Sequence, residues 1–302
     1  MGCGLLCVLA LQASAATPSP QNLLPKILAR VSEEAEVFFQ AAPRLVGQER
    51  LEHKGRRTQS RFRAALNSNP DEAPTGGYNR RELVSEFGFG ALKGAPDDLR
   101  ELRQVVEVDG RAVVKPEKAR QTLAFNMASE DDRARKRMLE SFEKHGLVGA
   151  AMDFAQAVLL FRRHNLEAYE FEYFMSGLSG LDAAMVFKYR QKSGEGMRVY
   201  GDKELARPKM QGELWVRRRD YVPLRVTFAI ESMEHGQPVT HDGGVQYIYS
   251  RLHGVILPVR VDYTRSVKGE RMVENVASYN GFRMFKVEAD IKFTPADEAP
   301  QQ

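Results

Sequence analysis

The most restrictive feature of this 302-residue chain is a series of short segments, between residues 166 and 293, in which apolar and polar side chains alternate. Alternation is clearest in four stretches, at 169–173, 185–189, 224–230 and 286–293. Successive side chains of a strand face opposite sides of a sheet, so one side of this sheet is apolar and the other is wet. An antiparallel sheet of this kind must close into a barrel, pair with a second sheet or be covered by helices.

Other segments are predicted to be helical. In residues 22–40 apolar side chains recur at three- and four-residue spacing, which indicates an amphipathic helix. Residues 116–125 and 129–144 also have helical spacing, and Ser129 with Asp132 is typical of a capping box.

The first half of the chain also contains predicted strands. Residues 83–89 have strand character, and the polar, basic stretch 49–66 is assigned to a strand as well. Asp109-Gly110 lies between runs rich in valine, and this dipeptide favours the positive φ angles of a tight hairpin turn.

Residues 147–161 are apolar on nearly every side, with only Asp153 and Gln156 polar. A helix of this composition has to be buried on more than one face. Two interpretations stay open: a core helix, or a helix inserted into the mouth of a barrel as a lid or plug.

The first 16 residues resemble a secretory signal peptide, because an apolar run is followed by the small residues Ala13, Ser14, Ala15 and Ala16. Both cysteines lie inside this leader, so the mature chain would have no thiol. The prediction is a periplasmic or secreted protein with one domain over residues 17–302. In that domain a helical insertion at about 116–163 precedes the strands at about 166–293.

The sequence shows no pattern that points to catalysis. The chain has no phosphate- or dinucleotide-binding loop, and its six histidines do not have zinc-protease spacing. His235, His241 and Asp242 could meet across a hairpin, but they flank turn glycines, which favours a turn role over a metal site. The prediction is therefore no enzyme, no metal and no cofactor. The net charge of +4 is spread over the chain, which disfavours nucleic acid as a partner.

The single tryptophan, Trp215, lies in an alternating stretch on the side of Glu213 and Arg217. It is expected either at a partly exposed rim or as an anchor for a ligand or a partner.

Two local phrases resemble those of the lipoprotein-carrier superfamily, which includes LolA, LolB and the outer-membrane lipoprotein-sorting proteins. One is Gly212–Val216 followed by Asp220–Val226, and the other is Gly254–Pro258 before Val259–Tyr263. The resemblance covers roughly residues 80–293. It implies an α+β fold, namely an incomplete antiparallel β-barrel, or strongly curved sheet, with an N-terminal helix and a helical insertion packed as a lid or plug.

The same resemblance implies a periplasmic carrier for a hydrophobic ligand, either a lipid or the acyl chains of a lipoprotein. An envelope protein is a possible further partner, and contact with the membrane would be transient at most. An apolar lid is expected around three residues of the helical insertion. The expected ligand-binding residues, lid and sheet together, are Phe154, Val158, Phe161, Phe187, Tyr189, Phe228, Tyr247 and Tyr249.

Two other functions stay open. The first is an exported structural or protein-interaction module of the cell envelope whose barrel is packed solid. The second is an enzyme whose residues converge only in three dimensions. A hollow and a filled barrel produce the same alternation, so the pattern does not distinguish a carrier from an interaction module.

Overall fold

A computed structural model of the chain describes residues 19–56, 77–92, 95–128, 133–145, 147, 153–179, 182–194, 199–200, 205–206, 209–234 and 236–284. Several predicted features lie outside these residues. They are the leader 1–16, the basic residues 57–66, the capping box at 129–132, His235 and the strand 286–293.

The described elements follow one another in an α+β order. The α-helices are α1 (Leu24–Ala41), α2 (Pro116–Ala128) and α3 (Arg133–Lys144), and the 3-10 helices are η1 (Ala42–Arg44), η2 (Ala157–Phe161) and η3 (Arg163–Ala168). The first four strands are β1 (Leu45–Arg56), β2 (Tyr78–Leu92), β3 (Ala95–Val108) and β4 (Arg111–Ala112). The others are β5 (Tyr169–Ser179), β6 (Asp182–Gln191), β7 (Val199–Tyr200), β8 (Leu205–Ala206), β9 (Met210–Arg217), β10 (Pro223–Glu234), β11 (Gln237–Ser250), β12 (Val255–Val267) and β13 (Glu270–Met284).

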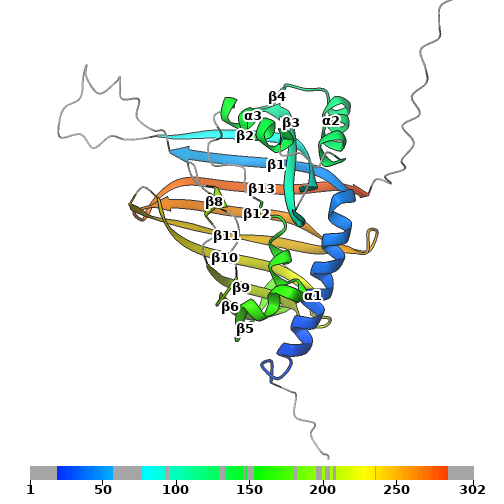
Figure 1. The fold of residues 1–302 in the computed structure, drawn as a ribbon, viewed down its shortest axis with the longest axis vertical. Helices are drawn as coiled ribbons and strands as arrows, with labels where there is room; N and C mark the ends of the chain where they lie inside the picture. Colours follow the sequence, from blue (N-terminus) through cyan, green and yellow to red (C-terminus); the bar gives the residue numbers. More distant parts are fainter. Residues whose placement is uncertain are drawn as a thin grey trace, which may run out of the picture.

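Eleven strands form one antiparallel sheet in the order β4-β3-β2-β1-β13-β12-β11-β10-β9-β6-β5 (Figure 1). The pairing of β1 with β13 joins the two ends of the described chain and places the first strands beside the last. Within the described residues, β4 and β5 are the two edges, so the sheet is strongly curved but not closed. The predicted fold class, an incomplete antiparallel barrel with helices, is confirmed.

The hairpin turn predicted at Asp109-Gly110 joins β3 to β4. Asp109 and Gly110 have φ angles of 49° and 77°. Two consecutive positive φ angles are the requirement of a type I′ turn, which explains why this dipeptide occurs there.

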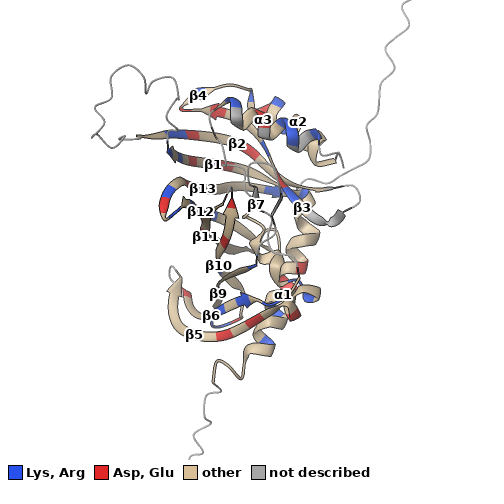
Figure 2. Cartoon of the chain, turned by 60° about the vertical axis from the view of Figure 1, so that its left-hand side comes forward, with Lys and Arg blue, Asp and Glu red and all other residues tan. Residues whose placement is uncertain are grey.

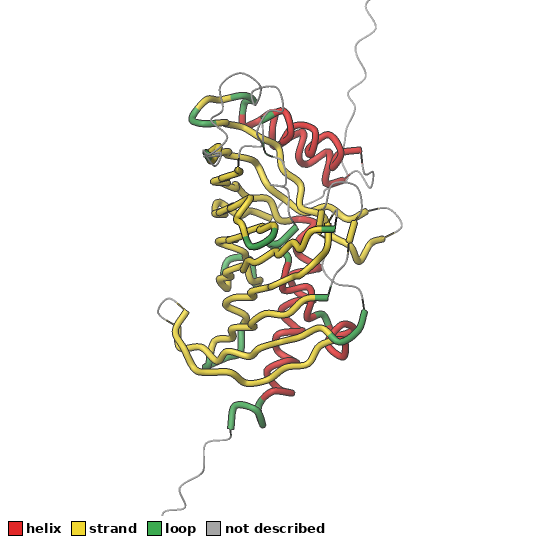
Figure 3. Tube along the Cα trace, turned by 90° about the vertical axis from the view of Figure 1, so that its left-hand side faces the viewer, coloured by secondary structure: helices red, strands yellow, loops and turns green. Residues whose placement is uncertain are grey.

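Helix α1 lies along one side of the curved sheet (Figure 3). Its buried face contains Ile27, Val31, Ala35 and Phe38, in agreement with the amphipathic helix predicted at 22–40. Phe38 meets Phe89 of β2 edge to face, with 5.4 Å between ring centroids. The helix thus covers apolar side chains that the open sheet would otherwise expose to water.

Helices α2 and α3 lie at the β3 end of the sheet, far from β5 (Figure 1). Met127 of α2 packs against Gly88 of β2, where a side chain would occupy the same space. Arg120 of α2 donates a 3.1 Å hydrogen bond to the buried carboxylate of Glu86. Both helices were predicted from sequence, and their place beside β2 and β3 comes from the tertiary structure.

The helix predicted at 147–161 is wrong. Among its described residues, 147 and 153–156 are not part of a helix, and the bond from the N–H of Ala157 to the carbonyl of Phe154 is a turn bond that leads into the short 3-10 helix η2. The apolar side chains are nevertheless buried, as predicted for a core segment. The physical reason for the difference is that side chains of the sheet bind the peptide groups of this segment, which removes the need for helical hydrogen bonds.

In the described part of the chain, no helix combines the length and the apolar character that crossing a bilayer requires.

Candidate functional site

The inner face of the sheet is covered by residues 153–161, which we call the plug segment. The ring of Phe154 stacks on Phe228 of β10, with 4.2 Å between centroids and 30° between the planes. The same ring lies 5.1 Å from Tyr263 of β12. Phe154 is 1% exposed, so its ring occupies the space in which the resemblance implied a ligand.

A second contact region lies around Phe161, at the other end of the plug segment. Its ring meets Tyr189 of β6 at 5.1 Å and Tyr169 of β5 at 5.7 Å, both edge to face. Aromatic pairs in this geometry contribute about 0.5–1.5 kcal/mol each beyond the area they bury. The plug segment is therefore held at both ends by aromatic contacts with the sheet.

Tyr247 of β11 fixes the middle of the plug segment. Its hydroxyl donates a 3.1 Å hydrogen bond to the carbonyl of Ala155 and accepts a 3.0 Å bond from the N–H of Val158. Complete burial raises the pKa of Tyr247, so the phenol stays protonated at physiological pH. One hydroxyl thus satisfies two peptide groups that a helix would have paired internally.

Seven of the eight sequence-predicted site residues come together in this layer. Phe154, Val158 and Phe161 come from the plug segment, and they contact Phe228, Tyr189 and Tyr247 as described. Phe187 is fully buried on the same face and packs against Tyr173 at 5.7 Å. Tyr249 is the exception, because it is 37% exposed near the end of β11.

A buried group of charges at the start of the plug segment was not predicted from the sequence. Arg103 of β3 donates two hydrogen bonds to Glu49 of β1, at 2.6 and 2.9 Å, and one of 2.5 Å to Glu101. The side chains of all three are at most 4% exposed. The opposite carboxylate oxygen of Glu101 accepts a 2.6 Å bond from the N–H of Ala155. Asp153 in turn accepts a 3.0 Å bond from the N–H of Glu101.

This charge cluster has a recognisable pattern in the sequence. Leu99, Glu101, Arg103 and Val105 occupy alternate positions of one strand and are all buried on its inner face. Two charged residues at inward positions of an apolar alternation indicate a buried ion pair or a functional site. The partner Glu49, 52 positions before Glu101, could not be assigned without knowing that β1 pairs with β2.

Burial is the largest influence on Glu101 and raises the pKa of its carboxyl to about 8, opposed by Arg103 and increased by Asp153 and Glu49. The pKa of this carboxyl is higher in the folded protein than its ordinary value of 4.5. Its contribution to the stability of the fold is therefore fully present below pH 4.5 and is lost as the pH rises through 8. Between these values the native state therefore binds a proton that the unfolded chain releases.

We expect the stability difference between wild type and Glu101→Gln to depend on pH. As the pH rises from 5 to 8.5, wild type should lose stability relative to the variant, because the glutamine cannot ionise. Urea unfolding at pH 5, 6.5 and 8.5 measures the difference in unfolding free energy between wild type and variant. The contributions of other titrating groups cancel in this difference. Glu82→Gln, at a partly exposed position of β2, is the control. Parallel pH profiles for wild type and Glu101→Gln would contradict the assignment.

Two histidines lie on the inner face away from the plug segment. His53 bonds Asn275 at 2.7 Å, and His241 bonds the hydroxyl of Tyr263 at 2.8 Å. Burial is the main cause that lowers the pKa of both imidazoles, which favours their neutral forms. They thus satisfy polar neighbours inside the sheet.

The possible metal set of His235, His241 and Asp242 is not brought together. His241 is buried, whereas Asp242, the next residue of the same strand, is exposed on the opposite face. His235 lies outside the described residues. No group of three metal-ligating side chains is present within the ranges that the structure describes.

Trp215 points to the outer face of the sheet, as the alternation predicted. It is partly buried, and its indole N–H donates a 2.9 Å hydrogen bond to Glu213. Its ring lies close to Gly177 of the edge strand β5. Trp215 therefore lies at a partly exposed rim, which was one of the two predicted positions, and it is outside the layer formed by the plug segment.

Comparison with known proteins yields similarity at the level of structure. No protein-family profile and no curated protein sequence matches the chain. One similar solved structure is a LolA superfamily protein from Nitrosomonas europaea, with 11% identity, a TM-score of 0.33, and coverage of 87% of this chain and 94% of the other. A second is a putative outer membrane lipoprotein-sorting protein domain from Vibrio parahaemolyticus, with 10% identity, a TM-score of 0.33, and coverage of 89% and 95%.

A DUF1329 family protein from Desulfovibrio piger is similar with 8% identity, a TM-score of 0.35, and coverage of 86% and 92%. These low identities and TM-scores leave the function to be argued from the residues of this chain.

Proposed function

We propose that this protein is an exported, non-catalytic carrier or binding protein for a hydrophobic ligand, such as a lipid or the acyl chain of a lipoprotein. The plug segment would leave the inner face of the sheet when the ligand enters. One observation carries the proposal: the plug segment, irregular at 153–156 and a short 3-10 helix at 157–161, covers the apolar inner face, and the sheet holds its peptide groups through the side chains of Glu101 and Tyr247.

The energetics of such an exchange are balanced. Releasing the plug segment exposes Phe154, Val158 and Phe161, and each large apolar side chain costs about 1.5–3 kcal/mol to expose. An acyl chain in the same place contributes about 0.8 kcal/mol for each buried CH₂ group. A chain of roughly ten buried CH₂ groups therefore offsets the three side chains, and the contacts of the empty protein keep the inner face dry without a ligand.

The proposal includes the organisation predicted from the sequence. Residues 1–16 would be removed on export, and residues 17–302 would form one domain that acts in the periplasm or outside the cell. No reacting group is needed, because loading and release require only that the plug segment move.

We expect Tyr247→Phe to raise the affinity for an apolar ligand by about 5- to 160-fold. The substitution keeps the ring but removes both hydrogen bonds to the plug segment, at about 0.5–1.5 kcal/mol each. Titration with an environment-sensitive apolar dye or a fluorescent fatty acid measures the change. Tyr249→Phe is the matched control, because Tyr249 lies on the same strand and is exposed. Equal affinity in wild type and Tyr247→Phe would contradict release of the plug segment.

The direct test is native mass spectrometry with organic extraction of residues 17–302, purified from a periplasmic expression host. A co-purified lipid or acylated species would support the carrier and identify the ligand class. A clean apo mass combined with no dye binding, in wild type and in Tyr247→Phe, would overturn it.

A second function is favoured by the tightness of the same layer. The predicted contact residues other than Tyr249 are at most 3% exposed and pack against one another. A core of this kind also suits an interaction module of the cell envelope that never opens. The two functions differ in whether the plug segment can be displaced.

A further inference from the structure

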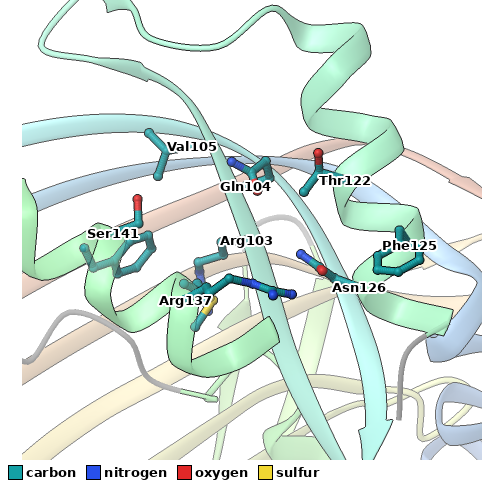
Figure 4. A pocket seen from close by; sticks show the side chains of 10 residues that line it. Arg103, Gln104, Val105, Thr122, Phe125, Asn126, Arg137 and Ser141 are labelled. Carbon is teal, nitrogen blue, oxygen red and sulfur yellow. The ribbon is translucent and has the colours of Figure 1, made fainter. Parts of the chain in front are cut away.

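Helices α2 and α3 and strand β3 form a pocket at the β3 end of the sheet (Figure 4). Its volume is about 310 Å³, at the lower end of the range of about 300–1,000 Å³ for ligand sites. Arg103, Gln104 and Val105 of β3 line it between the two helices. Among the described residues that line the pocket, none belongs to the plug segment, so the pocket is separate from the layer on the inner face.

The walls of the pocket follow from helical spacing. Thr122, Phe125 and Asn126 lie three and four positions apart in α2, so they share one face of that helix. Arg137 and Ser141 are four positions apart in α3 and share a face in the same way. In Figure 4 Asn126 and Arg137 extend toward each other across β3. The two helices thus present polar groups to the same space.

The positive charge of the pocket comes from Arg137. This residue is exposed, and no described residue forms an ion pair with it. The other cation of the lining, Arg103, is already bound by Glu49 and Glu101. Among the described lining residues none is Asp or Glu, and basic side chains recur along both helices (Figure 2). The pocket therefore suits an anion.

Amide groups and apolar side chains complete the lining. No hydrogen bond joins the side chain of Gln104 or Asn126 to another described residue, so both amides can bind a ligand. Val105 and Met138 are buried, whereas Phe125 is 71% exposed, an unusual degree for a phenylalanine. The pocket thus combines one guanidinium, two amides and an apolar surface.

We propose that this pocket binds a small monocarboxylic acid that carries an apolar ring or a short alkyl chain. Arg137 would pair with the carboxylate, whose two oxygens match the parallel N–H donors of a guanidinium. Asn126 would donate a further hydrogen bond, and Phe125 would contact the apolar part. This site goes beyond the proposed carrier function, because it lies outside the layer that the plug segment forms.

Charge and size define this ligand class. A neutral apolar molecule would leave the guanidinium of Arg137 without a partner, and a purely polar anion would make no use of Phe125. A phosphate monoester carries up to two negative charges, whereas one guanidinium neutralises a monocarboxylate. A pocket at the lower limit of ligand sites also favours a small molecule over the long acyl chain proposed for the inner face.

Ligand-observed NMR on residues 17–302 tests the proposal with a defined set of probes. The probes are benzoate, phenylacetate, hexanoate and octanoate, each compared with its neutral primary amide. We expect at least one carboxylate to bind with a dissociation constant of at most about 1 mM, as is usual for ligands of this size. Its amide should bind about tenfold more weakly or worse, because a hydrogen bond to a charged group is stronger than one to a neutral group.

Two matched variants locate the site. Arg137→Gln should weaken binding of the best carboxylate by about tenfold or more. Lys136→Gln, exposed on the same helix but outside the pocket, should change it by less than about threefold. Both side chains are exposed, so neither substitution should affect folding, which circular dichroism checks. Backbone amide chemical shifts should change in α2, α3 and β3 when the carboxylate is added.

The proposal is overturned if no carboxylate binds, if the acid and its amide bind equally, or if the two variants weaken binding equally. Chemical-shift changes confined to the plug segment would also overturn it, because the carboxylate would then occupy the inner layer. That last result would leave the apolar-ligand function standing. Failure of dye binding, in turn, would contradict the carrier function and leave this pocket unaffected.

Discussion

Replacing Arg103 with leucine should lower the free energy of unfolding by about 3–5 kcal/mol, the usual loss when one partner of a buried ion pair is removed. Arg103 is the only cation that hydrogen-bonds Glu49 or Glu101 among the contacts within the described ranges. Without its guanidinium, Glu49 and Glu101 would share an apolar interior with no cation among these contacts, and an ionised carboxylate there would have to take up a proton or move toward water. Urea unfolding followed by circular dichroism measures the loss.

The control for this substitution is Arg50→Leu. Arg50 lies on β1 next to Glu49 and pairs with Glu82 at the surface, where both side chains are more than one third exposed. Such a pair contributes at most about 1 kcal/mol. If Arg103→Leu does not fold, Arg103→Lys is the variant to measure. It keeps the charge but loses the bidentate contact with Glu49, so it should still be clearly less stable than wild type. A loss below 1 kcal/mol for both Arg103 variants would show that the cluster does not stabilise the fold.

Phe228→Ala should cost about 3–5 kcal/mol, because the ring is buried and its loss leaves a cavity in the sheet. Phe154→Ala removes the other ring of the same stacked pair, yet it should cost clearly less. The physical reason is that the plug segment can leave the sheet while the rest of the protein stays folded. The unfolding free energy that Phe154→Ala removes therefore cannot exceed the free energy needed to release the plug segment. Phe228 belongs to β10 and has no such alternative.

Denaturant unfolding of the two alanine variants tests this difference, with Phe125→Ala as the exposed control, for which a change within about 0.5 kcal/mol is expected. Phe154→Ala should also bind an apolar dye more tightly than wild type, because the space its ring fills becomes available. Equal losses for Phe154→Ala and Phe228→Ala, with no gain in dye binding, would favour the interaction module with a permanently packed core.

The helices, strands and turns of this protein are determined largely by residues that are close together in the sequence. Residues 224–230 form a strand because apolar side chains alternate with polar ones, and residues 24–41 form a helix because their apolar side chains recur every three or four positions. The turn at Asp109-Gly110 follows from the φ angles that these two residues tolerate. Each of these features depends on interactions within a few residues, and the sequence displays them directly.

The site depends on neighbours far apart in the chain. The sequence identified the aromatic and apolar residues of the inner layer, since composition and alternation mark them as buried. It did not show that residues 153–156 would be irregular, because the groups that bind their backbone, Glu101 and Tyr247, lie 54 and 92 positions from Ala155.

The charge cluster required the same long-range information. Glu49, Glu101 and Arg103 meet only because β1, β2 and β3 pair side by side. The sequence by itself therefore determined which segments are strands and helices and which faces are apolar. The tertiary structure decided which segment fills the inner face and how its polar groups are satisfied, because these hydrogen bonds and ion pairs join residues that are far apart in the chain and meet only in the folded protein.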